Sequence, residues 1–160
     1  MALSNLGTAL TRRFAVTGDL ASLDEAVTIH RRAQERTRAD HPNLGRYLAN
    51  LGAALDNRAQ FLRDSAAADE AIRVLRRAIE LTPRHHPQLP ERLDPFLVAL
   101  GSSMVEGTAP EVRESLAFAR EVVESTPAGR VGCARWVSNI AVLLREFEDT
   151  DAAETAIGLL

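Results

Sequence analysis

The chain of 160 residues contains no lysine, because all 19 of its basic residues are arginine. This absence excludes a Schiff-base lysine, a lysine nucleophile or base, and the phosphate-binding lysine of a P-loop. Cysteine is nearly absent as well, since Cys133 is the only one. A single cysteine cannot form an internal disulfide, and its scarcity fits a reducing compartment. We therefore expect a cytoplasmic protein.

Long apolar runs are also missing from the chain. No stretch approaches the roughly 18 apolar residues that a bilayer span requires, and residues 1–5 lack the basic and apolar segments of a signal peptide. The formal net charge is -3, with both signs interspersed, whereas nucleic-acid binding requires a basic surface. We therefore expect neither a membrane partner nor a nucleic-acid partner.

Aromatic residues make up only 4% of the chain, although 46% of it is hydrophobic. Alanine and leucine carry most of this apolar content, and both are strong helix formers, whereas aromatic and β-branched residues favour strands. The composition therefore predicts an all-α fold, and a chain of this length can bury a sizeable core.

What the sequence does contain is an internal repeat with a shift of 45 residues. The segment LSNLGTAL at residues 3–10 returns as LANLGAAL at residues 48–55, and His41-Pro42 returns as His86-Pro87. A repeat of this length indicates stacked units that share a core with their neighbours. We expect a single array over residues 1–160, with units at about 1–45, 46–90, 91–134 and 135–160, the last one truncated.

Each repeat contains two helical patterns. In the first repeat, Gly18 ends the first helix, and either Asp19 or Ser22 can cap the second. The apolar face of the first helix consists of Leu3, Leu6, Gly7, Leu10 and Phe14. The linkers between helices are short, so consecutive helices should pack as antiparallel hairpins. The sequence predicts an α-solenoid of eight helices, the last one in residues 151–160.

Gly7 and Gly52 occupy equivalent positions in the first helix of their repeats. A glycine there lets the two helices of a hairpin approach closely, and His30 should lie at this contact in the first repeat. The third repeat has Leu97 at the same position. We expect this leucine either to push the third hairpin apart or to be absorbed by a smaller neighbour such as Ala119.

These repeats resemble tetratricopeptide repeats in a long variant. The segment from Leu51-Gly52 through Ala71, Leu75 and Ala78 to Pro83 follows the tetratricopeptide pattern in order, with additional residues before Ala71. The motifs LSNLG, TGDL, LDEA and HP are similar to those in long repeats of bacterial multidomain proteins. Such repeats often adjoin a caspase-like CHAT peptidase domain or a signalling ATPase. The resemblance implies a tetratricopeptide-like superhelix that acts as a non-catalytic scaffold for protein partners, without a cofactor.

Catalytic residues are hard to find in this pattern. Cys133 falls on the repeat position of Leu44 and Leu89, which is an apolar packing position. The carboxylates of Asp24-Glu25 and Asp69-Glu70 recur with the repeat, and we expect them to complement helix dipoles at helix N-termini. Two alternatives stay open: an enzyme that uses Cys133 or the His85-His86 pair, and a structural spacer with no ligand.

The remaining candidate is the surface lined by the first helix of each repeat, which in tetratricopeptide arrays is a concave groove that receives a peptide. Asn5, Thr8 and Arg12 point away from the apolar face of their helix. Equivalent positions elsewhere are Asn50, Ala53 and Asn57, then Pro95, Val98 and Ser102, then Asn139, Val142 and Glu146. Asparagine can hydrogen-bond a ligand backbone, although these asparagines could instead hold neighbouring helix turns. We expect a partner-binding groove, with no catalytic or metal residues, formed by Asn5, Thr8, Arg12, Arg46, Asn50, Asn57, Asp94 and Asn139.

The ends of the array show no polar cap, which solenoids need for solubility. We expect either a fragment of a longer array or a homodimer formed through the uncapped ends.

Overall fold

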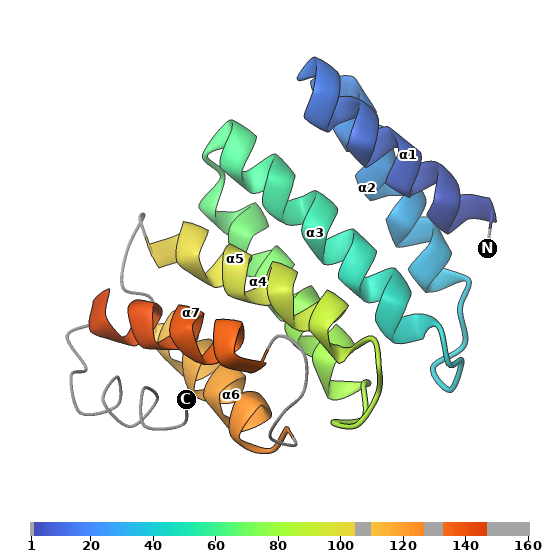
Figure 1. Cartoon of the computed structure of the whole chain (residues 1–160). Helices are drawn as coiled ribbons and strands as arrows, with labels where there is room; N and C mark the ends of the chain where they lie inside the picture. The colour runs from blue at the N-terminus through green and yellow to red at the C-terminus, as the bar shows by residue number, and fades with distance from the viewer. Residues whose placement is uncertain (1, 105–109, 127–132, 147–160) are drawn as a thin grey trace. The chain divides into compact units, whose positions relative to one another are not determined.

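The computed structural model describes residues 2–104, 110–126 and 133–146. These residues form seven α-helices and no strand, which confirms the all-α fold. The helices are α1 (Ala2–Thr17), α2 (Leu20–Glu35), α3 (Leu44–Leu62), α4 (Ser65–Glu80), α5 (Leu89–Met104), α6 (Pro110–Glu124) and α7 (Cys133–Glu146), shown in Figure 1. The eighth helix, expected in residues 151–160, lies outside the described residues.

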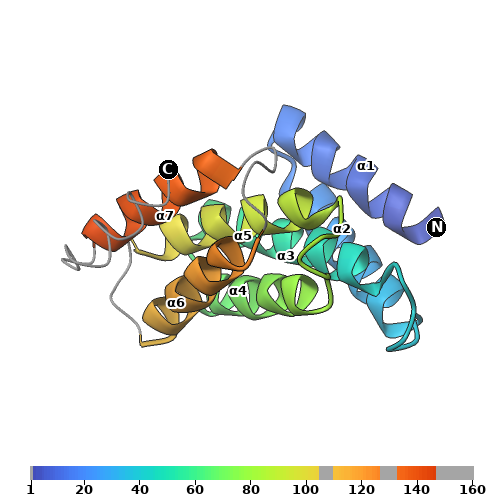
Figure 2. The same cartoon turned by 60° about the horizontal axis from the view of Figure 1, so that its bottom comes forward.

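The chain divides into two compact units, Met1–Leu81 and Thr82–Leu160. We call them the N-terminal unit and the C-terminal unit. In the N-terminal unit α1 packs against α2 and α3 packs against α4, while α2 also contacts α3, so that two antiparallel hairpins stack. In the described part of the C-terminal unit α5, α6 and α7 contact one another, and Figure 2 shows these helices from a second direction.

The end of α1 and the start of α2 follow the sequence signals closely. Gly18 adopts a positive φ of 68°, and its N–H donates to the Phe14 carbonyl oxygen at 2.7 Å. Asp19 is the N-cap of α2 and accepts a hydrogen bond from the Ala21 N–H at 3.2 Å. The Ser22 hydroxyl donates to the Asp19 carboxylate at 2.6 Å, and this bond lowers the pKa of Asp19. Of the two candidate caps, Asp19 is therefore the one used.

The main core cluster of the N-terminal unit joins the two hairpins. Leu23 and Val27 of α2 pack with Leu51 and Leu55 of α3 and with Ala71 of α4. Neither hairpin could bury these side chains alone, because each supplies only part of the cluster. This is the shared core that a stacked repeat requires.

Leu6 departs from the predicted apolar face of α1. Its neighbours on that face pack against α2, where Leu3 and Leu10 contact a cluster with Ala26 and Ile29. Leu6 itself is 47% exposed, whereas the equivalent Leu51 is 2% exposed. The difference arises because Leu51 packs against α2, and no described helix lies on the corresponding side of α1.

Gly7 and Gly52 bring the two helices of the first and second hairpins close together, as the sequence predicts. A Cβ atom placed on Gly7 would lie only 2.6 Å from the His30 ring, and one on Gly52 would lie 2.4 Å from Leu75 Cγ. His30 is 1% exposed, and burial lowers the pKa of its imidazole.

In the third repeat the large residue is on the first helix and the small residue is on the second helix, the reverse of the second repeat. Leu97 is buried on α5, Ala119 is fully buried on α6, and these two helices contact each other. A leucine therefore stands where Gly52 stands in the second repeat, and an alanine stands where Leu75 stands. This supports the second alternative, in which Leu97 is absorbed by a smaller residue.

The prediction that Asp24-Glu25 and Asp69-Glu70 complement helix dipoles at helix N-termini is wrong. Neither α2 nor α4 has an acidic residue in its first turn. Asp24 instead pairs with Arg58 of α3 at 2.9 Å, and Glu70 pairs with Arg31 of α2 at 2.6 Å. These carboxylates therefore connect neighbouring hairpins.

The two His-Pro linkers close in the same way. His41 Nδ1 accepts a hydrogen bond from the Asn43 N–H at 3.1 Å, and His86 Nδ1 accepts one from the Gln88 N–H at 3.1 Å. Each bond supplies a partner for a backbone N–H that the start of the following helix cannot satisfy internally. The recurrence of His-Pro therefore has a structural explanation.

Candidate partner-binding surface

Exposed large apolar side chains gather on the first helix of each repeat. In the part of the chain that the structure describes, they all belong to α1, α3, α5 or α7, and none lies on α2, α4 or α6. They are Leu6, Val16, Phe61, Leu62, Val98 and Val142. A cluster of apolar side chains exposed to water usually marks a surface that another molecule covers.

The predicted groove positions of the N-terminal unit differ in how far they are committed to internal bonds. Asn5 and Arg12 are exposed. Thr8 donates its hydroxyl to the Ser4 carbonyl oxygen at 2.9 Å, within α1. Because this bond is internal to the helix, Thr8 offers a partner mainly its remaining acceptor capacity.

The two asparagines of α3 take different internal partners. Asn50 Nδ2 donates to the Ser4 hydroxyl oxygen at 3.0 Å and so links α3 to α1. Asn57 Nδ2 donates to the Ala53 carbonyl oxygen at 2.9 Å. Both bonds use the amide nitrogen, and a carboxamide oxygen accepts hydrogen bonds independently of it. Asn57 thus has the bond between neighbouring helix turns that was the alternative to ligand binding, whereas the bond of Asn50 joins two helices.

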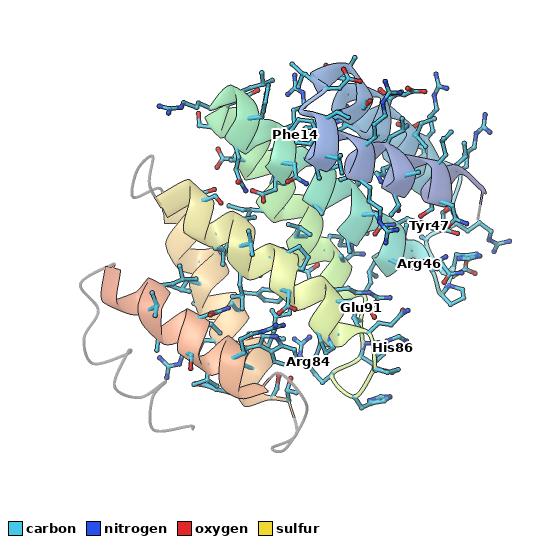
Figure 3. All side chains as sticks on the ribbon, turned by 45° about the horizontal axis from the view of Figure 1, so that its top comes forward. Phe14, Arg46, Tyr47, Arg84, His86 and Glu91 are labelled. Carbon is cyan, nitrogen blue, oxygen red and sulfur yellow. The ribbon has the colours of Figure 1, made fainter. Side chains whose placement is uncertain are left out.

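Arg46 lies near the start of α3, next to Tyr47 (Figure 3). The guanidinium carbon is 5.3 Å from the centre of the Tyr47 ring, within the range of a cation–π contact. The Arg46 Nε is buried and has no hydrogen-bond partner among the described residues. The ring of Tyr47 also stacks on His41, with centroids 6.4 Å apart.

Asp94 connects two helices of the C-terminal unit. Its carboxylate accepts a hydrogen bond from Trp136 Nε1 at 2.9 Å and pairs with Arg135, so that it joins α5 to α7. Trp136 is fully buried, and an indole N–H inside a core needs such an acceptor. Asn139, one turn further along α7, is exposed.

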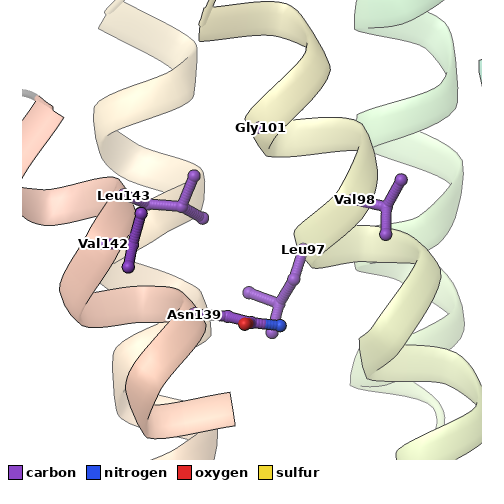
Figure 4. Close-up of a pocket in the computed structure, with 6 residues that line it drawn as sticks. All are labelled: Leu97, Val98, Gly101, Asn139, Val142 and Leu143. Atoms are coloured by element: carbon purple, nitrogen blue, oxygen red, sulfur yellow. The ribbon is translucent and has the colours of Figure 1, made fainter. Parts of the chain in front are cut away.

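A pocket of about 250 Å³ opens between α5 and α7 (Figure 4). Three positions of the predicted groove line it, namely Val98, Asn139 and Val142, and the other lining residues are Leu97, Gly101 and Leu143. Its wall is therefore apolar, with one carboxamide that can donate and accept hydrogen bonds. None of the six lining residues titrates, so the pocket is suited to holding an apolar side chain rather than to acid–base chemistry.

Asp56 is a buried polar residue that the sequence analysis did not single out. It is 6% exposed on α3, and its Oδ2 accepts a hydrogen bond from Gln60 Nε2 at 2.7 Å. Its Oδ1 has no hydrogen-bond partner among the described residues. Burial raises the pKa of this carboxyl to about 6. The helical spacing from Gly52 to Asp56 was the available signal, because it places the carboxylate on a packed face.

The described residues include only part of the alternative catalytic set. The Cys133 side chain lies outside the described residues. His86 Nδ1 is an acceptor in its linker, and His85 is exposed. No group of three or more histidine, cysteine, aspartate or glutamate residues in the described ranges could hold a metal ion. None of the described helices combines the length and apolar character needed to cross a membrane.

Comparison with known protein families identifies one segment. Residues 1–43 match a family model described as tetratricopeptide repeat. The matched segment contains α1 and α2, which form the first hairpin. Comparison of the chain with curated proteins finds none that matches it. A tetratricopeptide repeat implies, in general terms, a scaffold for protein interaction.

Proposed function

We propose that this chain is a non-catalytic protein–protein interaction scaffold. It binds a peptide, or an extended segment of a protein partner, on the surfaces that the first helices of the repeats present. In the N-terminal unit this surface belongs to α1 and α3, and in the C-terminal unit it belongs to α5 and α7.

The observation that carries this proposal is the distribution of exposed apolar side chains. Among the described side chains, no large apolar residue of a second helix is exposed, whereas first helices leave valine, leucine and phenylalanine in water. Val98 and Val142 are each more than half exposed, and both border the pocket between α5 and α7. Covering them with a partner would remove apolar surface from water, which is the main favourable term in most protein association.

Polar groups on the same helices supply the directional contacts that a peptide backbone needs. Asn139 borders the apolar pocket, and Asn5 is exposed on α1. A carboxamide beside an apolar pocket can pair with both the N–H and the C=O of an extended segment. We keep Asn5, Thr8, Arg12, Arg46, Asn50, Asn57, Asp94 and Asn139 as the proposed contact set.

We further propose that the chain serves as a docking or sensing array of a larger bacterial protein in the cytoplasm. The support is the resemblance of its long repeats to arrays beside CHAT peptidase or signalling ATPase domains. Sequencing the native open reading frame tests this proposal. A reading frame that encodes an adjoining peptidase or ATPase domain would support it, and one that encodes only helical repeats would contradict it.

The binding function is tested by affinity purification with three versions of the full chain. The first is the wild type, and the second carries Val98→Ser with Val142→Ser on the proposed surface. The third carries Arg32→Ser with Arg73→Ser, two exposed positions on second helices, as a matched control. We expect quantitative mass spectrometry to show a partner that the control retains and the valine variant loses. An identical set of proteins from all three would favour a structural spacer.

The enzyme alternative makes a different prediction about Cys133. A catalytic cysteine needs a lowered pKa and access to solvent, so the folded protein should then react quickly with a thiol reagent below neutral pH. Our proposal predicts slow modification in the folded state and rapid modification in urea.

A further inference from the structure

The two hairpins of the N-terminal unit repeat each other in detail. Gly18 and Arg63, which are 45 residues apart, both follow the first helix of their hairpin with a positive φ, 68° and 54°. Asp19 and Asp64 then cap the second helices with their side chains. Because the turns and the caps coincide, residues 45 positions apart lie on corresponding faces of the two hairpins.

The second hairpin packs on the first through one stripe of α3. Leu51 and Ala54 belong to the core cluster that α2 shares with α3, and they are 2% and 0% exposed. Phe61 continues the stripe, and its ring meets Phe14 of α1 edge-on with centroids 5.4 Å apart. The first hairpin therefore provides the apolar cover for this stripe.

Two ion pairs accompany the apolar stripe. Arg58 Nε of α3 lies 2.9 Å from Asp24 Oδ1, and Arg31 Nη2 lies 2.6 Å from Glu70 Oε1 of α4. Asp24 and Arg31 are seven residues apart on α2, so they lie two turns apart on one face of the helix. The face of α2 that receives the second hairpin thus has the pattern Leu-Asp-x-x-Val-x-x-x-Arg over residues 23–31.

The first hairpin exposes the stripe that the second hairpin buries. The equivalent positions, 45 residues earlier on α1, are Leu6, Ala9 and Val16. Leu6 is 47% exposed and Val16 is 87% exposed, and Ala9 is exposed as well. Their spacings of three and seven residues place them on one face of α1, and Figure 1 shows α1 at the outer edge of the N-terminal unit.

The charged positions of this face have no partner across it. Arg13 and Glu25 stand 45 residues before the arginine of α3 and the glutamate of α4 that pair with α2. The Arg13 side chain is 63% exposed and pairs with Asp19 of its own hairpin at 3.2 Å. Glu25 is exposed and forms no ion pair with the described residues. We call the following residues the open hairpin face: Leu6, Ala9, Arg13, Val16 and Glu25.

We propose that the open hairpin face binds an amphipathic helix of a partner protein that has the surface chemistry of α2. Such a helix carries an aspartate next to a leucine, a branched aliphatic residue three positions after the aspartate, and an arginine seven positions after it. Its apolar side chains cover Leu6 and Ala9, its carboxylate pairs with Arg13, and its guanidinium pairs with Glu25. This inference goes beyond the proposed function, because the open hairpin face shares no residue with the proposed contact set.

The two charges of the face determine which helix it accepts. An apolar stripe alone would receive many amphipathic helices. Arg13 and Glu25 have opposite signs and lie on different helices, so a helix with its aspartate and arginine exchanged would bring like charges together at both positions. Charge complementarity therefore selects both the sequence and the direction of the bound helix.

A second copy of this chain fits the open hairpin face less well. Both α2 and α4 have the required aspartate and arginine, but Val27 and Ile72 beside them are already buried within each copy, at 8% and 4% exposure. The sequence of α6 has Arg113 at the position of the aspartate, which would bring a like charge to Arg13. The face therefore suits a helix from another protein.

The experiment measures binding of a fluorescent synthetic peptide to the full chain by fluorescence anisotropy. The peptide has the sequence of residues 19–38, with acetylated and amidated ends, and so carries the required pattern. We expect saturable binding that Leu6→Ser and Arg13→Glu each weaken by about tenfold in Kd. Arg73→Glu changes an exposed arginine of α4 in the same way and is the matched control, which should leave the Kd unchanged.

Exchanging charges between chain and peptide separates a direct contact from a disturbed fold. A peptide with Asp24→Arg should bind the wild type weakly and should regain its affinity for the Arg13→Glu variant. The second pair is tested with Glu25→Arg in the chain and Arg31→Glu in the peptide. A variant that had lost binding because its fold was disturbed would not be restored by either peptide.

Several outcomes would overturn the inference. No saturable binding at about 1 mM peptide, or binding that ignores both Leu6→Ser and Arg13→Glu, would contradict it. Binding that only Arg58→Glu weakens would mean that the peptide replaces α2 in its own core. Self-association that Leu6→Ser abolishes would assign the face to a second copy, and a native reading frame with a repeat hairpin directly ahead of Met1 would assign it to the interior of a longer array. None of these outcomes changes the test of the proposed function, which depends on other residues.

Discussion

The contact between Gly52 and Leu75 allows a direct test of how the two helices of a hairpin are held together. A Cβ atom at Gly52 would lie 2.4 Å from Leu75 Cγ, and Leu75 is fully buried. The leucine therefore cannot move aside without disturbing the packing of α3 on α4. Overpacking of this kind costs about 1–3 kcal/mol, whereas alanine gains about 1 kcal/mol over glycine in helix propensity. We expect Gly52→Ala to lower the free energy of unfolding by up to about 2 kcal/mol.

A double-mutant cycle makes this prediction specific. Leu75→Ala alone should cost about 2–5 kcal/mol because it leaves a cavity. In the double variant the added methyl group occupies part of that cavity and no longer meets the leucine. The double variant should therefore lose less stability than the sum of the two single losses, by about 1 kcal/mol or more. The measurement is urea unfolding of all four proteins, followed by circular dichroism.

Gly101→Ala provides the matched control, because a Cβ atom there would lie at an ordinary 3.5 Å from Leu143 Cδ2. The gain in helix propensity is then unopposed, and we expect Gly101→Ala to stabilise the protein by up to about 1 kcal/mol. Strictly additive effects in the cycle would refute the close-packing explanation. So would a Gly52→Ala variant as stable as Gly101→Ala.

Three further predictions concern single carboxylates. Because burial raises the pKa of Asp56 from 3.8 to about 6, the wild type should lose stability as the pH rises from about 4 to about 6. In urea unfolding at pH 7, Asp56→Asn should therefore be more stable than the wild type by about 1–2 kcal/mol, a figure that includes the cost of burying the amide. At pH 4 the variant should lose this advantage. Asp64→Ala removes the N-cap bond to Ala67 of α4 and should cost about 1 kcal/mol, whereas Asp69→Ala should have little effect in the same assay. Glu70→Ala breaks an exposed ion pair with Arg31 and should lower the free energy of unfolding by less than about 1 kcal/mol. Thermal unfolding should show a smaller difference between the variant and the wild type in high salt, because salt screens the pair.

The sequence was sufficient for features that depend on one helix or on the repeat shift. Gly18 ends α1 because a left-handed residue is a local requirement that glycine meets. The repeat shift aligned His30 with Leu75, and both indeed lie against the glycine of the preceding helix. These predictions succeeded because equivalent residues in a repeat meet equivalent neighbours.

Features that depend on the neighbouring hairpin were not accessible in the same way. Asp24 and Glu70 have partners on other helices, Arg58 and Arg31, which no pattern within one helix reveals. Leu6 has nearly the same local sequence as Leu51, but it lacks the helix that covers Leu51. Repeat equivalence fails wherever the two copies have different surroundings.

The candidate site shows the same division. Helical spacing identified the face that carries Val98, Asn139 and Val142, and these three line one pocket. The spacing did not reveal that Asn50 bonds to Ser4 of α1, or that Asp94 bonds to Trp136 of α7. Those bonds join helices whose relative rotation is fixed by packing, so the sequence of one helix does not determine them.

The two residues that face each other inside a hairpin are matched in size, and this restricts how the gene can recombine. The contacts are glycine with histidine in the first repeat and glycine with leucine in the second, and the equivalent positions of the third repeat hold leucine and alanine. A crossover inside a hairpin that joined α5 to α4 would set Leu97 against Leu75, and one that joined α1 to α6 would leave Gly7 facing Ala119 across a gap. Crossovers in the linkers between hairpins would keep each pair intact. The hairpin, rather than the single helix, is therefore the unit that duplication and exchange can pass on without loss of packing.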